Sequence, residues 1–481
     1  MNTSEPGAFA PGGPMSAAYR PLTIGLLAII TCAAFEAMAV ATAMPLVAKD
    51  LGGLTSYGLA FSLFLTGSLL GTVIAGSWTD IKGPRPALIV GLSLMVGGLL
   101  VAGAAGDFSI LTLGRAVSGL GAGLMIVAVY VIIGQVFPSV AQPTVFGWLA
   151  AAWVLPALIG PYLSGLLAQY VSWRLVFVSV APIVVLAVVL VWPKVKRLGA
   201  PEFPSMNPAQ GRRRSVLGVF LAVGVFAAQW AAHGFAAPDG VDGPAAYLLA
   251  ALLLAGVAAA SLTLPRLLPK GSLRFARGLP SIVLNRGLMT LAFFGAEAFI
   301  PLMLVDVRGL DASTAGLALT GAAIGWSAGS FTQARFRFER AWLLVSGGAL
   351  LTMTMTALAL LASPAVPVWV LVVVWAVSGY GMGMGMSTSS VLTLKLSPSA
   401  ERGRNSSSLQ LSDMLGGVVG TAGAGTVYAL LWDRNIGEST GVFVVIWASL
   451  AVFSMLAAVA GLRARRHETK TEDSKVGVAL P

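Results

Sequence analysis

This chain of 481 residues has few charged side chains, one cysteine and two histidines. Charged residues make up 10% of the sequence, whereas a soluble domain carries about 25%. A single cysteine, Cys32, excludes an intrachain disulfide framework and a thiolate metal cluster, and we expect it to be a small packing residue. The sequence lacks a Walker-type phosphate loop, so nothing points to ATP as the energy source. We therefore expect neither a cofactor nor a metal site.

Apolar residues replace the missing charge. They make up 57% of the chain, and its mean hydropathy is +0.86. Apolar runs recur along the sequence, and each is long enough to cross about 30 Å of hydrocarbon as a helix of roughly 20 residues. We count fourteen. The predicted spans are 22–44, 57–78, 87–105, 109–133, 144–168, 175–192, 215–236, 245–264, 284–305, 312–333, 341–362, 367–393, 408–431 and 441–462.

Basic residues gather in alternate connections between these spans. If the N-terminus is cytoplasmic, most of the 30 basic residues lie on the cytoplasmic side. The opposite side then holds Lys49, Arg174, Arg308 and Arg434, and Arg115 lies inside a span. This bias predicts a multi-pass protein of the cell membrane with both termini in the cytoplasm. It also explains the net charge of +11 without nucleic acid, and contact with anionic lipid headgroups is a second expected role of the basic loops.

The sequence repeats itself. At an offset of 258 residues, Gly58, Gly67 and Gly71 reappear as Gly316, Gly325 and Gly329. At an offset of 260, residues 116–123 reappear as 376–383, and Gly160 and Gly165 as Gly420 and Gly425. A duplicated membrane bundle is the usual build of a secondary transporter, whose substrate site lies between the two copies.

The offset also predicts the domain organisation. Six helices of about 20 residues with short loops need about 200 residues, so the offset implies roughly fifty inserted residues. We therefore expect an all-α integral membrane protein built from two pseudo-symmetric six-helix bundles and two linker helices. The expected parts are a cytoplasmic N-terminus without regular structure (1–19), a bundle (20–192), connectors (193–283) with two extra membrane helices (215–264), a second bundle (284–462) and a cytoplasmic tail (463–481).

After the second span, the stretch 76–85 reads Gly-Ser-Trp-Thr-Asp-Ile-Lys-Gly-Pro-Arg. It resembles the cytoplasmic loop motif Gly-x-Leu-Ala-Asp-Arg-x-Gly-Arg-Lys of the major facilitator superfamily. The matching positions are Gly76, Asp80, Gly83 and Arg85, and Lys82 substitutes for basic positions lost to Ile81 and Pro84. Glycine permits close backbone approach and unusual dihedral angles. The resemblance implies a latch in which Asp80 pairs with Lys82 or Arg85, and a solvated turn is the alternative.

Three further motifs resemble the fourteen-helix drug:proton antiporter branch of this superfamily. Arg115 is followed by Gly119, as in the branch motif Arg-x-x-x-Gly. The stretch 156–165, which contains Pro156, Gly160, Pro161 and Gly165, resembles its antiporter motif, although the last glycine of that motif is Leu166 here. Glu36 lies nine residues before Pro45, where the branch has Asp. The resemblance covers residues 20–462 and implies a closure point at Gly160-Pro161, where proline is also expected to kink or break the helix. Simple helix packing is the alternative.

Four charged residues lie within the predicted spans: Glu36, Arg115, Glu297 and Asp413. An ionised side chain at mid-bilayer costs about 2.5–3.5 kcal/mol on insertion scales, so each needs a reason. None is duplicated, because Arg115 corresponds to Trp375 in the repeat and Asp413 to Trp153. We hypothesise that Glu36 and Glu297 carry protons or a cationic substrate, that Arg115 tunes or relays the proton, and that Asp413 is a third carrier. Structural ion pairs are the alternative.

We therefore predict a proton-coupled exporter of lipophilic or cationic drugs, working by alternating access and giving multidrug efflux and antibiotic resistance. Its expected partners are a lipophilic small molecule, protons and membrane lipids, without nucleic acid, and we expect a monomer. Tryptophan and methionine suit a broad pocket but often serve as core: Trp78, Trp148, Trp153, Trp326, Trp375, Met382, Met384 and Met386. The alternative is a lipid or metabolite transporter of the same fold. An integral membrane enzyme is less favoured, because the connections hold no polar catalytic cluster.

Overall fold

The computed structural model describes residues 13–138, 140–199, 208–235, 241–335, 339–360, 362, 366–398, 401–432 and 440–476. Its regular structure in these ranges is helical, and no strand occurs there. The long helices are α1 (Arg20–Asp50), α2 (Tyr57–Lys82), α3 (Pro84–Gly103), α4 (Phe108–Val136), α5 (Gln142–Leu167), α7 (Val180–Val195), α8 (Pro208–Phe235), α9 (Pro244–Leu267), α10 (Leu279–Asp306), α11 (Ala312–Arg335), α12 (Arg340–Leu360), α13 (Val368–Leu396), α14 (Arg402–Leu431) and α15 (Gly441–Val476).

Twelve helical segments in the described part are long and apolar enough to cross a membrane, whereas the sequence predicts fourteen. Two of the predicted spans, 144–168 and 175–192, fall in one continuous segment of 52 residues, Thr144–Val195. It joins α5 to α7 through a π-helical turn, η3 (Ala168–Ser172), and the short helix α6 (Trp173–Val178). The predicted span 312–333 forms α11, but this helix is not among the twelve because small and polar residues lower its hydropathy.

The two predicted copies make matching helix contacts. α2 packs on α4 in the first half, and α11 packs on α13 in the second. A Cβ atom on Gly119 would lie 2.1 Å from the carbonyl oxygen of Phe64, and one on Gly379 would lie 2.0 Å from that of Ala322. Gly119 and Gly379 are repeat counterparts at an offset of 260, as Phe64 and Ala322 are at 258. Glycine is needed at both places because the helix backbones touch.

We call α1–α7 the first half and α10–α15 the second half. The halves meet at one end, along contacts that we call the seam. There, Lys49 Nζ and Asp306 Oδ1 form an ion pair at 3.0 Å, and the Tyr57 hydroxyl donates to the carbonyl oxygen of Ala298 at 2.9 Å. Gly58 and Gly425 touch directly, since a Cβ atom on Gly58 would lie 2.4 Å from the Cα atom of Gly425.

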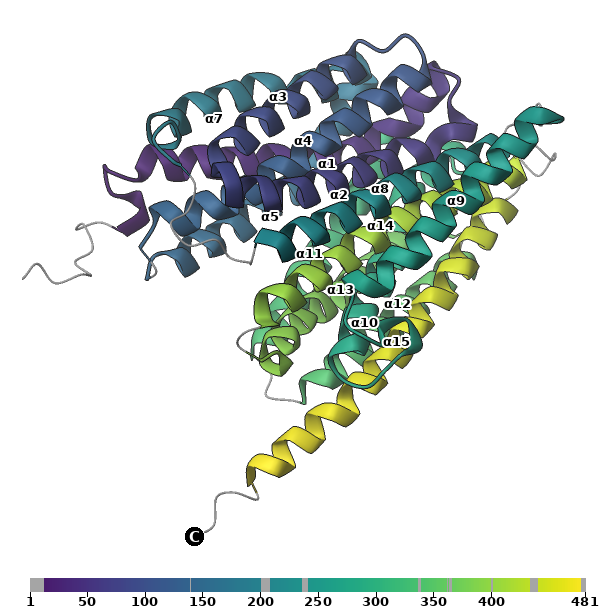
Figure 1. Ribbon diagram of the computed structural model, residues 1–481. Coiled ribbons are helices and arrows are strands. Elements are labelled where there is room, and N and C mark those ends of the chain that lie inside the picture. Colours follow the sequence, from purple (N-terminus) through teal and green to yellow (C-terminus); the bar gives the residue numbers. More distant parts are fainter. Residues whose placement is uncertain are drawn as a thin grey trace, which may run out of the picture.

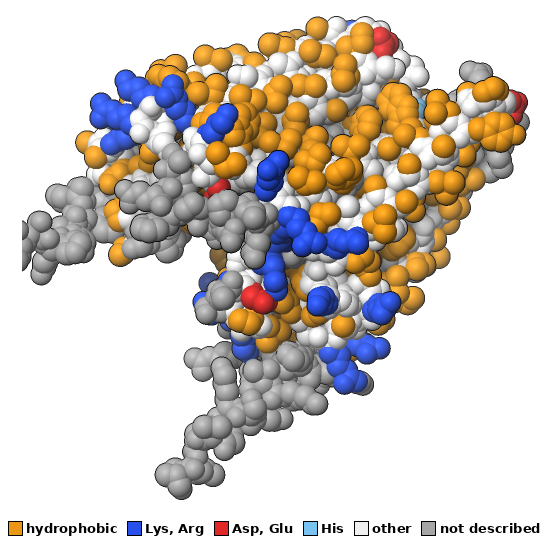
Figure 2. Space-filling model, in the orientation of Figure 1, with side chains coloured by type: hydrophobic (Ala, Val, Ile, Leu, Met, Phe, Trp, Pro, Cys, Tyr) orange, Lys and Arg blue, Asp and Glu red, His pale blue; other side chains and the backbone are white. Residues whose placement is uncertain are grey.

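At the other end, the two halves diverge toward the side on which the C-terminus is marked (Figure 1). Lysine and arginine side chains gather at these diverging ends, while hydrophobic side chains cover the surface between them and the seam (Figure 2). We call this end the basic end. A wide apolar surface with charge at its margin suits a protein that spans a bilayer.

The extra helices α8 and α9 form a hairpin that packs on α2. Gln229 Nε2 donates to Thr66 Oγ1 at 2.9 Å, and the His233 ring lies 3.1 Å from Ser56 Oγ. By contrast, only 6% of the residues in the apolar 18-residue stretch of α9 are buried. The hairpin is therefore attached to the first half through α8, while α9 presents its apolar surface outward.

Candidate functional site

The first candidate site lies where α1 meets α4. Glu36 Oε1 accepts hydrogen bonds from Arg115 Nη1 at 2.5 Å and from Ser118 Oγ at 2.8 Å. Arg115 Nε donates to the carbonyl oxygen of Ala60 on α2 at 3.2 Å, and its guanidinium carbon lies 4.2 Å from the ring centre of Phe64. The structure thus brings Glu36 and Arg115 together as one ion pair that joins three helices.

This ion pair is enclosed. The side chains of Glu36 and Arg115 are 1% and 2% exposed, and Glu36 lies about 24 Å along α1 from its first residue. The second carboxyl oxygen of Glu36, Oε2, is buried and has no hydrogen-bond partner among the described groups. A buried polar atom without a partner is uncommon and needs an explanation. A proton bound to Oε2 leaves both hydrogen bonds to Oε1 in place.

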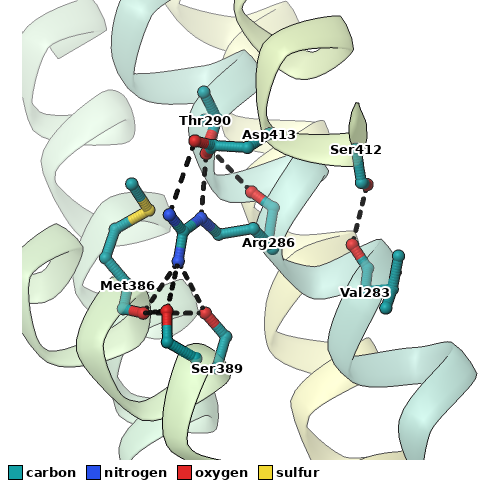
Figure 3. A network of polar contacts seen from close by, with 8 residues as sticks. Val283, Arg286, Thr290, Met386, Ser389, Ser412 and Asp413 are labelled. Carbon is teal, nitrogen blue, oxygen red and sulfur yellow. Dashed lines mark hydrogen bonds and ion pairs between the residues drawn. The ribbon is translucent and has the colours of Figure 1, made fainter. Parts of the chain in front are cut away.

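The second candidate site joins α10, α13 and α14. Arg286 pairs with Asp413, with Nε 2.9 Å from Oδ1 and Nη2 3.4 Å from Oδ2. Thr290 Oγ1 donates to Asp413 Oδ1 at 2.6 Å. From its other side, Arg286 Nη1 donates to the carbonyl oxygen of Met386 at 2.8 Å and to Ser389 Oγ at 3.0 Å (Figure 3). Arg286 therefore ties α10 to both neighbouring helices.

The sequence prediction missed this role of Arg286. Arg286 lies at the start of the predicted span 284–305, among the basic residues expected on the cytoplasmic side, whereas the structure places it two turns inside α10, which begins at Leu279. The missed signal is the stretch from Gly278 to Pro280, because glycine before a helix and proline in its first turn mark a helix start. Arg286 consequently belongs to the interior, where it partners Asp413.

Glu297 is separate from both ion pairs. It lies on α10 roughly 16 Å beyond Arg286, toward the seam, and its side chain is half-buried. In the described ranges it makes neither a hydrogen bond nor an ion pair. The next residue, Ala298, accepts the Tyr57 hydrogen bond of the seam. The predicted acidic residues Glu36, Glu297 and Asp413 thus lie on three different helices, α1, α10 and α14, and each has its own surroundings.

The predicted loop motif forms the turn between α2 and α3. Gly83 connects Lys82, the last residue of α2, to Pro84, the first of α3, with φ 77° and ψ 176°. A positive φ of this size favours glycine. The missing Cβ atom of Gly76 has nothing within 4 Å, so the close approach expected there is absent. Of the two motif glycines, Gly83 is the one that the backbone requires.

Arg85 connects this turn to the end of α7. Its Nη1 atom donates to the carbonyl oxygen of Lys196 at 3.2 Å, and its guanidinium carbon lies 5.4 Å from the ring centre of Trp192. Both partners belong to the first half. The contact of Asp80 with Lys82 or Arg85 stays a prediction, as does the latch.

The predicted antiporter motif lies on α5, which continues as a helix through Pro156 and Pro161. The helix is not interrupted at Gly160-Pro161, and the irregular turn is η3, which follows α5; the kink expected at Pro161 stays a prediction. The motif faces α11 of the other half. A Cβ atom on Gly165 would lie 2.5 Å from the Cα atom of Ser313, and one on Gly316 would lie 2.5 Å from the carbonyl oxygen of Pro161. The motif is therefore part of the seam.

An aromatic cluster occupies the second half where the first half has its ion pair. Trp375, the repeat counterpart of Arg115, is 1% exposed and stacks on Phe293, with ring centres 4.7 Å apart. Trp326 meets the same Phe293 ring edge-on at 5.4 Å. Met382 and Met384 are buried as well, so these two methionines belong to the core.

Comparison with known proteins identifies relatives of the chain. The family model described as Major Facilitator Superfamily matches residues 26–285 and 282–480. An uncharacterized MFS-type transporter of Mycobacterium tuberculosis is 29% identical over 330 residues, which are 67% of this chain and 47% of the relative. The multidrug transporter protein MdtP of Bacillus subtilis is 26% identical over 314 residues, 62% of this chain and 54% of MdtP. The chain thus spans about half the length of these curated relatives.

Solved structures share the fold at low sequence identity. A bacterial homolog of the human lysosomal transporter Spinster has a TM-score of 0.65 at 16% identity, covering 93% of this chain and 97% of its own. A peptide transporter POT in complex with sulfate has a TM-score of 0.61 at 17% identity, with coverages of 92% and 95%. These likenesses concern the fold alone.

Proposed function

The chain belongs to the Major Facilitator Superfamily, whose members are transporters, and we propose that it exports lipophilic or cationic small molecules in exchange for protons. One observation carries the proposal: the Glu36–Arg115 pair is enclosed among membrane helices and leaves Glu36 Oε2 without a partner. Ionisable residues inside membrane segments are rare and mark ion or substrate pathways. The free oxygen gives the proton a place to bind inside an otherwise satisfied pair.

Protonation of Glu36 changes the charge of the α1–α4 contact. With Glu36 ionised, the pair is neutral as a whole. With Glu36 protonated, Arg115 becomes a buried cation without a counter-charge, which an apolar interior strongly disfavours. The protonated protein therefore favours an arrangement in which Arg115 reaches water or another anion. Glu36 acts as the proton carrier, and Arg115 as the group that converts its protonation into a change of conformation.

The rearrangement that we propose opens the seam and closes the basic end. The seam contacts include the Lys49–Asp306 pair, the hydrogen bonds from Tyr57 to Ala298 and from Thr320 to Leu158, and the glycine contacts. Glu297, beside the seam, and Asp413, nearer the basic end, are further proton or cation sites in this cycle. The loop motif residues Gly76, Asp80, Lys82, Gly83 and Arg85 act as a latch at the basic end, and Pro156, Gly160, Pro161 and Gly165 close the seam side.

We further propose fourteen membrane crossings in a six, two and six arrangement with both termini cytoplasmic. The 52-residue segment Thr144–Val195 is long enough for two crossings of about 20 residues each. α11 packs on α13 as α2 packs on α4, which supports a crossing by α11 despite its low hydropathy. The basic end faces the cytoplasm of the cell membrane in this arrangement.

The substrate class rests on relatives and on side chains. MdtP and multidrug resistance protein 3 of Bacillus subtilis, the latter 28% identical over 167 residues, are named for multidrug transport. Trp148, Trp153, Trp326 and Met386 are half-buried and provide adaptable apolar contacts. We expect a monomer that moves drug-like compounds and so contributes to antibiotic resistance.

Purified protein in liposomes tests the proposal. A pH gradient is imposed across the vesicle membrane, and cationic dyes are added one at a time to the outside. Uptake of each dye is compared for wild type, Glu36→Gln and Glu297→Gln. We expect Glu36→Gln to bring gradient-driven transport to the level of empty vesicles, because its amide cannot exchange a proton. Transport without a gradient serves as the control for intact protein.

Two results would contradict the proposal. Undiminished gradient-driven transport by Glu36→Gln removes Glu36 from the carrier role. If wild type moves a phospholipid or a polar metabolite but none of the dyes, the protein is a lipid or metabolite transporter of the same fold and not a drug exporter.

A further inference from the structure

The basic ends of α8, α9 and α14 meet in a cluster that holds almost no acid. Described residues 208–217, 264–280 and 401–409 contain a single acidic residue, Glu401, which pairs with Arg404 at 2.7 Å. The basic residues of this cluster are Arg212, Arg213, Arg214, Arg266, Lys270, Arg274, Arg277, Arg402 and Arg404. Basic side chains gather in this part of the surface, near the start of α8 and the end of α9 (Figure 2). These ranges therefore carry a net positive charge.

Arg214 occupies the centre of the junction. Its Nη2 atom donates to the carbonyl oxygen of Leu267 at 3.4 Å and to Ser408 Oγ at 3.3 Å, so it touches both α9 and α14. Its Nη1 atom is buried and has no hydrogen-bond partner among the described groups. Ser408 Oγ also donates to the carbonyl oxygen of Arg404 at 3.0 Å, so Arg404 lies one turn away on α14, and the two positive charges repel each other. A donor without an acceptor beside a second guanidinium is a poor arrangement for the protein alone and a good one around an anion.

We propose that Arg214 and Arg404 bind the phosphate headgroup of an anionic phospholipid between the α8–α9 hairpin and α14. A guanidinium is the side chain best suited to a phosphate, because its donors match the phosphate oxygens.

The apolar surroundings select a lipid rather than a free phosphate ion. Leu267 and Leu268 pack with Leu409 and Leu415 of α14 and with Leu221 of α8 in one buried hydrophobic cluster, which fixes the helix junction beside the arginines. One turn before this junction, Leu262 of α9 is exposed. The outward face of α9 is apolar and exposed along its length. A headgroup at Arg214 therefore has acyl-chain surface directly next to it, whereas a free ion would use none of it.

The site gives the two extra helices a role. Toward the seam, the hairpin is bonded to α2 of the first half through Gln229 and His233. At the basic end, Arg214 and the lipid bind it to α14 of the second half. A bound lipid thus makes the hairpin a connection between two halves that must move against each other.

Native mass spectrometry of the full-length protein in detergent tests the site. The protein is titrated with phosphatidylglycerol, with phosphatidylcholine of the same acyl chains, and with inorganic phosphate. We expect tight binding of phosphatidylglycerol alone. At the strength usual for a basic residue near anionic lipid, Arg404→Gln weakens it about fivefold and Arg214→Gln with Arg404→Gln about thirtyfold. Arg197→Gln, at the end of α7 in the other half, removes the same charge and should have no effect.

The proposal is overturned if phosphatidylcholine binds as tightly as phosphatidylglycerol, or if Arg404→Gln and Arg197→Gln bind it equally. Tight binding of inorganic phosphate without any preference for the lipid assigns the arginines to a soluble anion instead. Should Arg214→Gln not purify as a single species, Arg404→Gln decides the matter alone, since its side chain is exposed and its loss leaves the helix junction intact.

Discussion

The two halves of the molecule place opposite chemistry at corresponding positions. In the first half, Arg115 pairs with Glu36 and the pair is sealed from solvent. In the second half, Trp375 stands at the position of Arg115 and stacks on Phe293. The backbones around them match, because counterpart glycines touch counterpart carbonyl groups in both halves.

This contrast separates the scaffold from the chemistry. Helix packing follows the repeat, since a missing side chain allows the same close approach wherever it occurs. The ion pair does not follow it. The second half has its own pair, Arg286 with Asp413. It joins α10, the counterpart of α1, to α14 and lies nearer the basic end, where its side chains are 10% and 14% exposed. In the cycle that we propose, the group that changes charge lies in the first half, at the position that a neutral aromatic stack occupies in the second.

Removal of Arg115 should have the largest effect, because it separates the ion pair that distinguishes the first half from the second. Arg115→Met leaves the Glu36 carboxylate buried without its counter-charge, and we expect a loss of about 3–5 kcal/mol in the free energy of unfolding. The double variant with Glu36→Gln should recover most of it, because no charge then remains. Thermal unfolding in detergent measures both. Equal unfolding temperatures for the single and the double variant would show that the two residues are not coupled.

Removal of Arg286 tests the pair of the second half. Arg286→Gln loses hydrogen bonds to charged Asp413, to Met386 and to Ser389, for which we expect a loss of about 1.5–3 kcal/mol. The effect should be smaller than that of Arg115→Met, because Asp413 keeps its bond from Thr290 and some contact with water. Chemical denaturation of both variants ranks them. A larger loss of unfolding free energy for Arg286→Gln than for Arg115→Met would mean that the ion pair of the second half is the more important one for stability.

Substitution of counterpart glycines tests whether helix packing is equivalent in the two halves. Gly119→Val and Gly379→Val each force a side chain against a carbonyl group, and we expect similar losses of about 1–3 kcal/mol in the two halves. Gly134→Val is the control on α4, since its missing Cβ atom has nothing within 4 Å. The unfolding temperatures of the three variants are compared with that of wild type. A loss in only one half would mean that the packing is not equivalent.

The smallest expected effect concerns Asp311, which caps the start of α11. Hydrogen bonds from Ser313 and Thr314 lower the pKa of its carboxyl group below the usual value. The ionised form is therefore the stabilising one. Its contribution is complete above the unfolded-state pKa of about 3.9 and is lost as the pH falls through the lower folded-state pKa. Asp311→Ala should lower the free energy of unfolding by about 1 kcal/mol at neutral pH.

The measurement for Asp311 is unfolding between pH 3 and neutral pH. The difference between wild type and Asp311→Ala should shrink toward the acid end. A difference that stays constant with pH would mean that the cap does not depend on ionisation. Asp107, which caps α4 of the first half through Ser109 and Ile110, provides the matched alanine variant.

Much of the helical arrangement could be predicted from the sequence, because a membrane span is a local property of about 20 residues. The repeat, read from a few glycines, reappears in the structure as matching helix contacts, although the sequence did not specify which helices meet. Glu36 and Arg115 were each singled out, but their pairing was not, since they are 79 residues apart on helices whose rotation no single span specifies. The role of Arg286 was missed for a simpler reason: the predicted helix starts at residue 284, five residues later than α10 does.

The contact between Gly58 and Gly425 has a consequence for energy conservation in the cell. Glycine has only hydrogen atoms to present at this contact, so the movement of the halves that we propose disrupts no side-chain interaction at this point. A methyl group on either residue would instead hold the outer ends apart by its own diameter. In the transport cycle that we propose, water then enters the gap, and the proton gradient dissipates through the protein even when no cargo is moved.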